Sequence, residues 1–156
     1  MHVNNPDAVR LCVARLDGWK LGFDGYSKFW QGCSADIKPE EGSQVIGVVW
    51  VLKDIDPLDK QEVGYDPIQV QVQSLEDGKT MVCRTYVEHQ EYLKLSEGKP
   101  KIPSLAYKNV CIAGALESGL PKDYIDNNIM NIETNGIIPE TARKLVPECT
   151  GLSLEL

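Results

Sequence analysis

Residues 67–87 read PIQVQVQSLEDGKTMVCRTYV, and this stretch decides the fold. In its first part, 67–73, an apolar residue stands at every second position with glutamine between, which is the period of a β-strand with one buried face. The run Glu76-Asp77-Gly78-Lys79 is a turn signal, and the segment 80–87 is rich enough in β-formers to return as the partner strand. The sequence therefore predicts a two-stranded hairpin.

Two further strand segments lie upstream of this hairpin. Val9–Leu16 (VRLCVARL) is apolar and ends at Asp17-Gly18. Because Asp-Gly is a strong hairpin signal, we expect Trp19–Phe23 to fold back and pair with it. Val45–Leu52 (VIGVVWVL) is almost continuously apolar, which is typical of a strand that is buried on both faces.

The helical signals come mostly in the second half of the chain. A short helix over 58–62 is predicted between the strands, with Asp56 as its N-cap and Pro57 as its first residue. Ser104 is a suitable N-cap for a longer helix that ends near Gly119. The predicted helices after residue 100 cover 104–118, 121–131 and 138–145.

Strands first and helices later indicate an α+β domain with a small, mostly antiparallel sheet or barrel and flanking helices. We expect one domain over 1–146, which is an ordinary domain length. Residues 147–156 carry no periodic pattern and are expected to form a loose C-terminal tail.

Composition excludes several classes of function. The formal net charge of −7 argues against a nucleic-acid partner, because phosphate binding needs a basic face. No apolar run reaches the roughly 18 residues of a membrane span, so no membrane partner is expected. Five cysteines without a C-x-x-C pair, and only two histidines, make a metal site unexpected and are typical of reduced thiols in a cytoplasmic protein.

Glu62, with Tyr65, Tyr86 and Tyr107, is the group that stands out for chemistry. A carboxylate can take up and return a proton, and a tyrosine hydroxyl can hydrogen-bond a ligand. Each residue also has a purely structural interpretation. Glu62 taken alone is a solvated surface carboxylate, and the tyrosines are residues at the edge of a core.

The order and spacing of five short motifs between about residues 5 and 130 resemble the γ-glutamylcyclotransferase family. The motifs are Trp30-x-Gly32-x-x-Ala35-x-Ile37-x-Pro39-x-x-Gly42-x-x-Val45-x-Gly47-Val48-Val49-Trp50, Leu58-Asp59-Lys60-Gln61-Glu62, Cys83-Arg84-Thr85-Tyr86, Pro103-Ser104-x-x-Tyr107 and Gly114-Ala115-x-x-x-Gly119-Leu120-Pro121-x-x-Tyr124.

This resemblance implies an enzyme that cyclises a γ-glutamyl amino acid or peptide to 5-oxoproline and releases the amino acid, in glutathione-related metabolism. It makes Glu62 the catalytic acid and base. Tyr107, Tyr65 and Tyr86, in that order, become the substrate-binding residues. The implied partner is a small γ-glutamyl substrate, and neither a metal nor an organic cofactor is implied.

The sequence departs from the family pattern at its beginning and after Glu62. The family starts with a strand and a Y-G-S-N-L loop, a motif that does not occur in this sequence, and its glycine after the catalytic glutamate is Val63 here. Without that loop we expect the chain as it stands to form little or no 5-oxoproline. Without that strand we expect an exposed sheet edge, and hence a homodimer or aggregation.

Two other hypotheses stay open on the sequence. The chain is an impaired, truncated isoform that acts as a binding or regulatory protein, or it is an unrelated β-rich interaction domain. An upstream segment that carries Y-G-S-N-L would favour the enzyme over the isoform.

Overall fold

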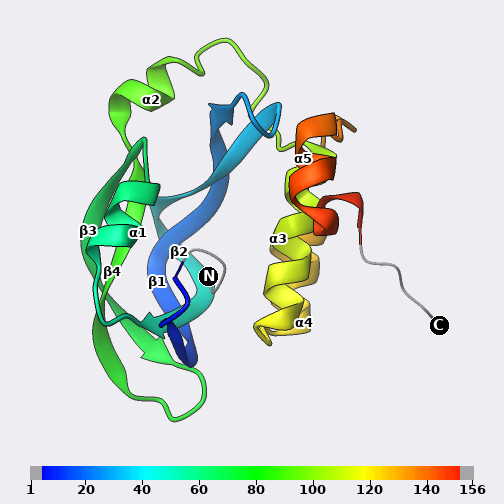
Figure 1. Ribbon diagram of the computed structural model, residues 1–156. Coiled ribbons are helices and arrows are strands. Elements are labelled where there is room, and N and C mark those ends of the chain that lie inside the picture. The colour runs from blue at the N-terminus through cyan, green and yellow to red at the C-terminus, as the bar shows by residue number, and fades with distance from the viewer. Residues whose placement is uncertain (1–4, 152–156) are drawn as a thin grey trace, which may run out of the picture. The chain divides into compact units, whose positions relative to one another are not determined.

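The computed structural model describes residues 5–151, and residues 1–4 and 152–156 are left out of the description (Figure 1). The chain divides into two compact units. We call residues 1–20 and 37–89 the sheet unit, and residues 21–36 and 90–156 the helical unit. Strands β1 (Val9–Ser27) and β2 (Gly32–Val51) contribute residues to both units.

The strands form one four-stranded sheet in the order β2-β1-β3-β4. β3 (Tyr65–Ser74) pairs antiparallel with β4 (Thr80–Glu88) from Tyr65 opposite Glu88 to Gln73 opposite Thr80. β1 pairs antiparallel with β3, with Ala14 opposite Ser74. The predicted hairpin and the mostly antiparallel α+β fold are therefore confirmed.

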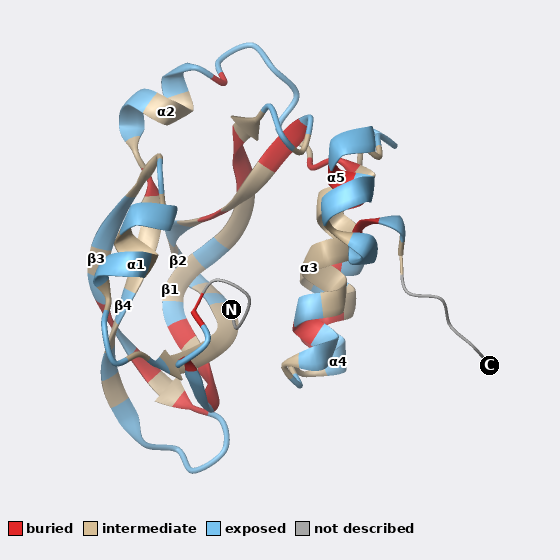
Figure 2. Cartoon of the chain, in the orientation of Figure 1, coloured by how far each residue is buried: buried red, intermediate tan, exposed pale blue. Residues whose placement is uncertain are grey.

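The alternation over 67–73 has the predicted consequence. Val70 and Val72 are buried, whereas Gln69 and Gln71 are exposed. Figure 2 shows the burial classes along the chain. The two valines pack into the core of the sheet unit, because alternate residues of a strand share one face. The buried members of this core are Cys12, Ala14, Leu16, Val70 and Val72.

The hairpin predicted at Asp17-Gly18 is wrong. β1 runs without interruption through both residues, and Gly18 sits inside it with φ of +79°. Glycine takes this conformation without a steric penalty, so the chain passes through an irregular strand position instead of reversing. The pairing partners of β1 are β2 and β3 rather than its own second half.

The apolar run 45–52 is only half-buried, which also differs from the prediction. It is the last part of β2, which starts as early as Gly32, and Val51 at its end is 50% exposed. β2 stands at one end of the sheet order. A strand at an edge has one neighbour fewer to cover it, so its apolar residues stay partly accessible.

Helix α1 (Asp56–Gln61) lies where the short helix was predicted and has Pro57 in its first turn. Its N-cap is Ile55 rather than Asp56. No side-chain hydrogen bond caps the helix at Ile55, and the Asp56 N–H donates to Asp54 Oδ1 at 3.0 Å. The predicted helix is confirmed, and its N-cap lies one residue earlier than predicted.

The helical unit contains α2 (Gln90–Lys94), which was not predicted, and α3 (Leu105–Glu117). The Ser104 side chain caps α3 by accepting the Tyr107 N–H at 3.2 Å, as predicted. Gly119 follows the end of the helix with φ of +75°.

Three further helical segments complete this unit: α4 (Lys122–Ile125) with a π-helical turn over Asp126–Met130, α5 (Glu140–Leu145) and a 3₁₀ helix over Pro147–Thr150. Tyr124, Ile125 and Ile129, on the segment predicted as the second helix, are buried. Residues 147–150 pack through Cys149, which is fully buried with Ala106 and Ala142, where the sequence indicated a loose tail. The end of that tail, 152–156, lies outside the described residues.

Candidate functional site

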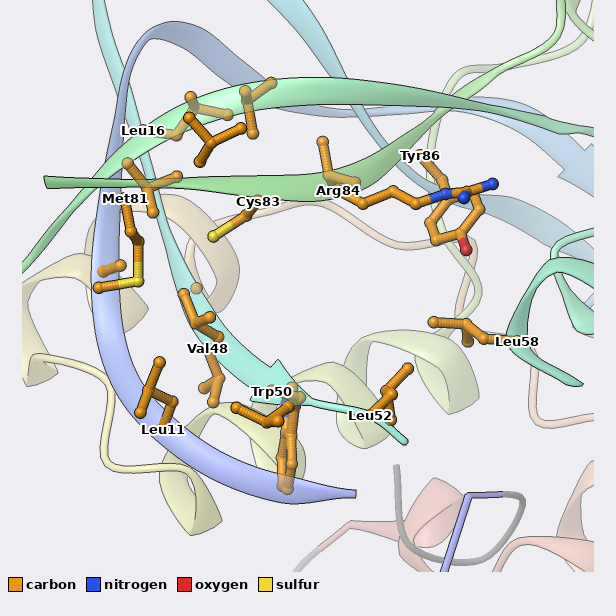
Figure 3. A pocket seen from close by; sticks show the side chains of 18 of the residues that line it. Leu11, Leu16, Val48, Trp50, Leu52, Leu58, Met81, Cys83, Arg84 and Tyr86 are labelled. Carbon is orange, nitrogen blue, oxygen red and sulfur yellow. The ribbon is translucent and has the colours of Figure 1, made fainter. Parts of the chain in front are cut away.

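A cavity of about 690 Å³ opens in the sheet unit (Figure 3). Its walls come from all four strands and from α1, and they are mostly aliphatic, including Leu16, Val48, Leu52 and Leu58. Ligand sites of small molecules have this volume and this mixture of apolar walls with a few polar groups. The titratable side chains that line the cavity are Glu62, Cys83, Arg84 and Tyr86.

Glu62 occupies the C-terminal end of α1. Its backbone N–H donates to the Leu58 carbonyl at 3.1 Å, and its own carbonyl accepts the Tyr65 N–H at 3.2 Å. The side chain is half-buried, and this burial raises the pKa of the Glu62 carboxyl above its ordinary value. A carboxylate that is partly desolvated binds a proton more readily, which suits proton transfer near neutral pH.

Tyr86 lines the same cavity from β4. Its hydroxyl donates to Asp59 Oδ1 at 2.5 Å. Burial, and then the hydrogen bond to Asp59, raise the pKa of Tyr86 to about 12, so the hydroxyl stays protonated. The Arg84 Nη2 donates to the other Asp59 oxygen at 2.8 Å, and Arg84 and Tyr86 lie side by side at one end of the cavity (Figure 3).

Tyr65 does not belong to the cavity lining. Its hydroxyl donates to Glu88 Oε1 at 3.3 Å, the residue opposite Tyr65 in the β3–β4 hairpin. The family resemblance implied Tyr65 as a substrate-binding residue. In the structure the Tyr65 N–H donates to the Glu62 carbonyl, while the Tyr65 side chain makes its hydrogen bond within the β3–β4 hairpin.

Tyr107 belongs to the helical unit, in the first turn of α3. Its hydroxyl accepts the Ala35 N–H at 3.1 Å. Its ring packs against Phe23, with centroids 6.2 Å apart, and against Trp30, with centroids 5.2 Å apart. The expected approach of Tyr107 to Glu62 stays a prediction.

The sequence analysis missed Asp59 and Arg84 as members of this constellation. Asp59 was predicted only as part of a short helix and of a motif, and Arg84 only as part of a motif. Two sequence spacings could have revealed these residues. Asp59 precedes Glu62 by three residues, about one helical turn, and Arg84 and Tyr86 are two apart on a strand and so share a face.

The described residues, 5–151, hold no cluster of three or more potential metal ligands. Within the same range, every helix is too short or too polar to cross a bilayer. The lining of the cavity offers the chemistry of its own side chains. It combines a half-buried carboxylate, a protonated phenol and a guanidinium around an apolar cavity.

The AIG2-like family matches residues 44–127 of the chain, a range that contains Glu62, Tyr86 and Tyr107. The mouse and bovine proteins named gamma-glutamylcyclotransferase are each 37% identical to it, over 144 and 145 residues, which cover 86% of this chain and 72% of each relative. The human protein of the same name is 36% identical over the same shares.

Two solved structures are similar to the chain at comparable sequence identity. A structure titled gamma-glutamyl cyclotransferase superposes with a TM-score of 0.78 at 34% identity, covering 94% of this chain and 89% of that one. A crystal structure of an uncharacterized human protein superposes with a TM-score of 0.77 at 35% identity and the same coverage.

Proposed function

The chain belongs to the γ-glutamylcyclotransferase family, and we propose that it cyclises the γ-glutamyl group of a γ-glutamyl amino acid or small peptide to 5-oxoproline. The observation that carries the mechanism is the half-buried carboxylate of Glu62 in the apolar cavity. The alternative, a binding or regulatory protein, has no feature of the described residues in its favour.

The reaction moves two protons from the attacking nitrogen to the leaving nitrogen. Glu62 takes one proton from the substrate ammonium, and the freed α-amino nitrogen attacks its own γ-carbonyl carbon. Glu62 delivers this proton to the leaving nitrogen as the bond from that carbon to the leaving amino group breaks. The ring nitrogen loses its second proton to the released amine, which departs as an ammonium, so the Glu62 carboxylate is regenerated. Because the attack closes a five-membered ring within one molecule, holding the substrate folded supplies much of the rate.

The substrate-binding roles extend this proposal. Tyr86 lines the cavity together with Glu62, and its hydroxyl oxygen can still accept a hydrogen bond from a substrate ammonium. Tyr107 and Tyr65 are further proposed substrate contacts, with support from the motif resemblance alone. The hydroxyls of both already have protein partners, Ala35 and Glu88.

The setting of the reaction is also a proposal. We place it in the cytoplasm, within glutathione-related metabolism, because the five cysteines, all among the described residues, form no disulfide with one another, as a reducing compartment maintains them. A homodimer is proposed from the sheet order, in which β2 and β4 each have one strand neighbour.

The test is the release of 5-oxoproline from γ-glutamyl-alanine by the chain and by its Glu62→Gln variant. Loss of a general base lowers turnover by about 10²- to 10⁴-fold, so the variant should fall by that amount. Glu41→Gln, an exposed glutamate on β2, is the matched control and should keep full activity. Because the chain as it stands lacks the Y-G-S-N-L motif and is expected to release little, the same variants are also assayed with a relative's N-terminal strand and Y-G-S-N-L loop added. Absence of release in both forms would contradict the proposed reaction, and release that Glu62→Gln leaves unchanged would show that the base is elsewhere.

A further inference from the structure

The Asp59 carboxylate joins α1 to two side chains of β4. One oxygen accepts the Tyr86 hydroxyl at 2.5 Å and the other accepts the Arg84 guanidinium at 2.8 Å. Arg84 and Tyr86 stand two residues apart on the strand, so both can reach one carboxylate from the same face. The guanidinium also lies 5.8 Å from the Tyr86 ring centroid. The reaction described above uses neither Asp59 nor Arg84.

Helix α1 needs such an attachment. It has only six residues, none of them buried, and a helix of one to two turns is not stable by itself. Leu58 contributes apolar contact at the cavity wall. The two charge-assisted bonds of Asp59 fix the rotation of the helix about its axis, which Leu58 alone would leave loose.

Glu62 is the residue that this attachment would place. It follows Asp59 by three positions, about one helical turn, and caps the C-terminal end of α1. A change in the rotation or tilt of so short a helix would move the Glu62 carboxylate directly.

We propose that Asp59 is a positioning residue for this cyclisation, which holds α1 and the Tyr86 hydroxyl so that the Glu62 carboxylate stays in the cavity. The inference rests on the proposed function. It assigns Asp59 no contact with the substrate. Breaking its hydrogen bonds to Tyr86 and Arg84 would change the rate only by displacing Glu62 and Tyr86.

A merely structural ion pair is the rival explanation. The side chains of Asp59 and Arg84 are 34% and 37% exposed, and exposed pairs of this kind contribute little to stability. A structural pair would affect the protonation of Glu62 only through the lost charge of Asp59, so the charge-neutral Tyr86→Phe would leave it unchanged. A positioning residue would not, because releasing α1 lets water reach the Glu62 carboxylate.

The decisive measurement is the pH titration of the Glu62 carboxyl by carbon NMR, in the unmodified chain and in Asp59→Asn, Tyr86→Phe and Asp56→Asn. The titratable groups near Glu62 are Cys83, Arg84 and Tyr86 on β4, and α1 adds Asp56, Asp59 and Lys60. In the unmodified chain Glu62 should titrate above the exposed glutamates, since burial raises its pKa.

We expect Asp59→Asn to move this titration down toward that of an exposed glutamate. Better solvation, the loss of a nearby negative charge and the release of Arg84 all lower the pKa of an acid. Tyr86→Phe removes one tether without changing the net charge and should shift the titration in the same direction. Asp56→Asn removes a like charge from the same helix and should leave it almost unchanged. A Glu62 titration that is the same in Asp59→Asn as in the unmodified chain would overturn the inference.

The kinetic arm separates this inference from the proposed function. A misplacement of about 1 Å can cost about 10²-fold in rate, so Asp59→Asn should lower kcat by one to two orders of magnitude with a much smaller change in KM. If Glu62→Gln is inactive while Asp59→Asn equals the unmodified chain in kcat and in the titration, only the inference about Asp59 fails. If no 5-oxoproline is released, the proposed function fails, and if release does not depend on Glu62, the assignment of Glu62 as the base fails. In both cases the titration still decides whether Asp59 positions that carboxylate.

Discussion

Glu62 combines two properties that oppose each other. The cavity that gives its carboxylate a raised pKa also makes the charged form unfavourable in the folded protein. A base of this kind therefore lowers the stability of the folded protein while it makes proton transfer possible, as is common at active sites.

The first prediction at this scale concerns stability. Glu62→Gln should unfold at an equal or higher temperature than the unmodified chain at neutral pH, even though its turnover is lost. The folded-state pKa of Glu62 is raised, so its contribution to stability is fully present below the pKa of an unfolded glutamate, about 4.3, and is lost as the pH rises through the folded-state pKa. The advantage of glutamine should therefore appear over that pH interval. Thermal melts of both proteins across the interval test this, and a variant that is less stable at neutral pH would contradict it.

The residues of the site differ in how far the sequence could reveal them. Glu62 and Tyr86 were predicted and line one cavity. Asp59 was predicted as part of a helix but not as a partner of Tyr86, because pairing across 27 positions depends on how α1 meets β4. The side chain of Tyr65 lies with Glu88 because hairpin register, rather than closeness in sequence, sets its neighbour.

Among the elements, β2 begins at a glycine whose environment explains its place in the sequence motif. A Cβ atom built on Gly32 would lie 2.2 Å from the Ser104 backbone nitrogen and 2.8 Å from the Pro103 carbonyl carbon. The neighbouring Cys33 N–H donates to the Ile102 carbonyl at 2.9 Å, which fixes the same two segments together. The start of β2 and the segment before α3 thus touch through their backbones.

We predict that Gly32→Ala is strongly destabilising. The clashing atoms belong to backbone, which cannot rotate away, so the cost should reach at least about 3 kcal/mol, the upper part of the range for overpacking. Gly47→Ala on the same strand is the matched control, since nothing lies within 4 Å of its added Cβ. Urea unfolding of the two variants measures the difference. A Gly32→Ala protein as stable as the Gly47→Ala protein would show that the two segments are not in contact.

Local sequence patterns predicted an element well where the pattern lies within the residues of that element. Alternation found β3, and the cap at Ser104 found α3. The Asp17-Gly18 signal failed because a turn dipeptide does not specify whether the chain reverses or continues as a strand. That choice depends on which strands pair with β1, and pairing partners are distant in sequence.

At the scale of the whole molecule, the two units are linked by their shared strands. β1 starts in the sheet unit and ends in the helical unit, and β2 starts in the helical unit and ends in the sheet unit. Neither unit is a continuous stretch of chain. Unfolding one of them alone would have to break both strands in the middle.

The last prediction follows from these shared strands: the chain should unfold as one cooperative domain, as we expected for residues 1–146. Single domains of this size commonly unfold in one transition that every probe reports alike. The three tryptophans supply the probes, because Trp19 and Trp50 belong to the sheet unit and Trp30 to the helical unit. In variants that keep only Trp19 or only Trp30, with phenylalanine at the other two positions, the urea midpoints should coincide.

Ser104→Ala sharpens this test. It removes the side-chain cap of α3 inside the helical unit and should cost about 1 kcal/mol. In one cooperative domain the loss moves the Trp19 midpoint as far as the Trp30 midpoint, although the substitution lies in the other unit. Val72→Ala, in the buried core of the sheet unit, is the reciprocal test and should likewise lower the midpoints of both probes together. A Trp30 midpoint that falls while the Trp19 midpoint stays would mean that the units unfold separately, and that β1 and β2 break where the units divide.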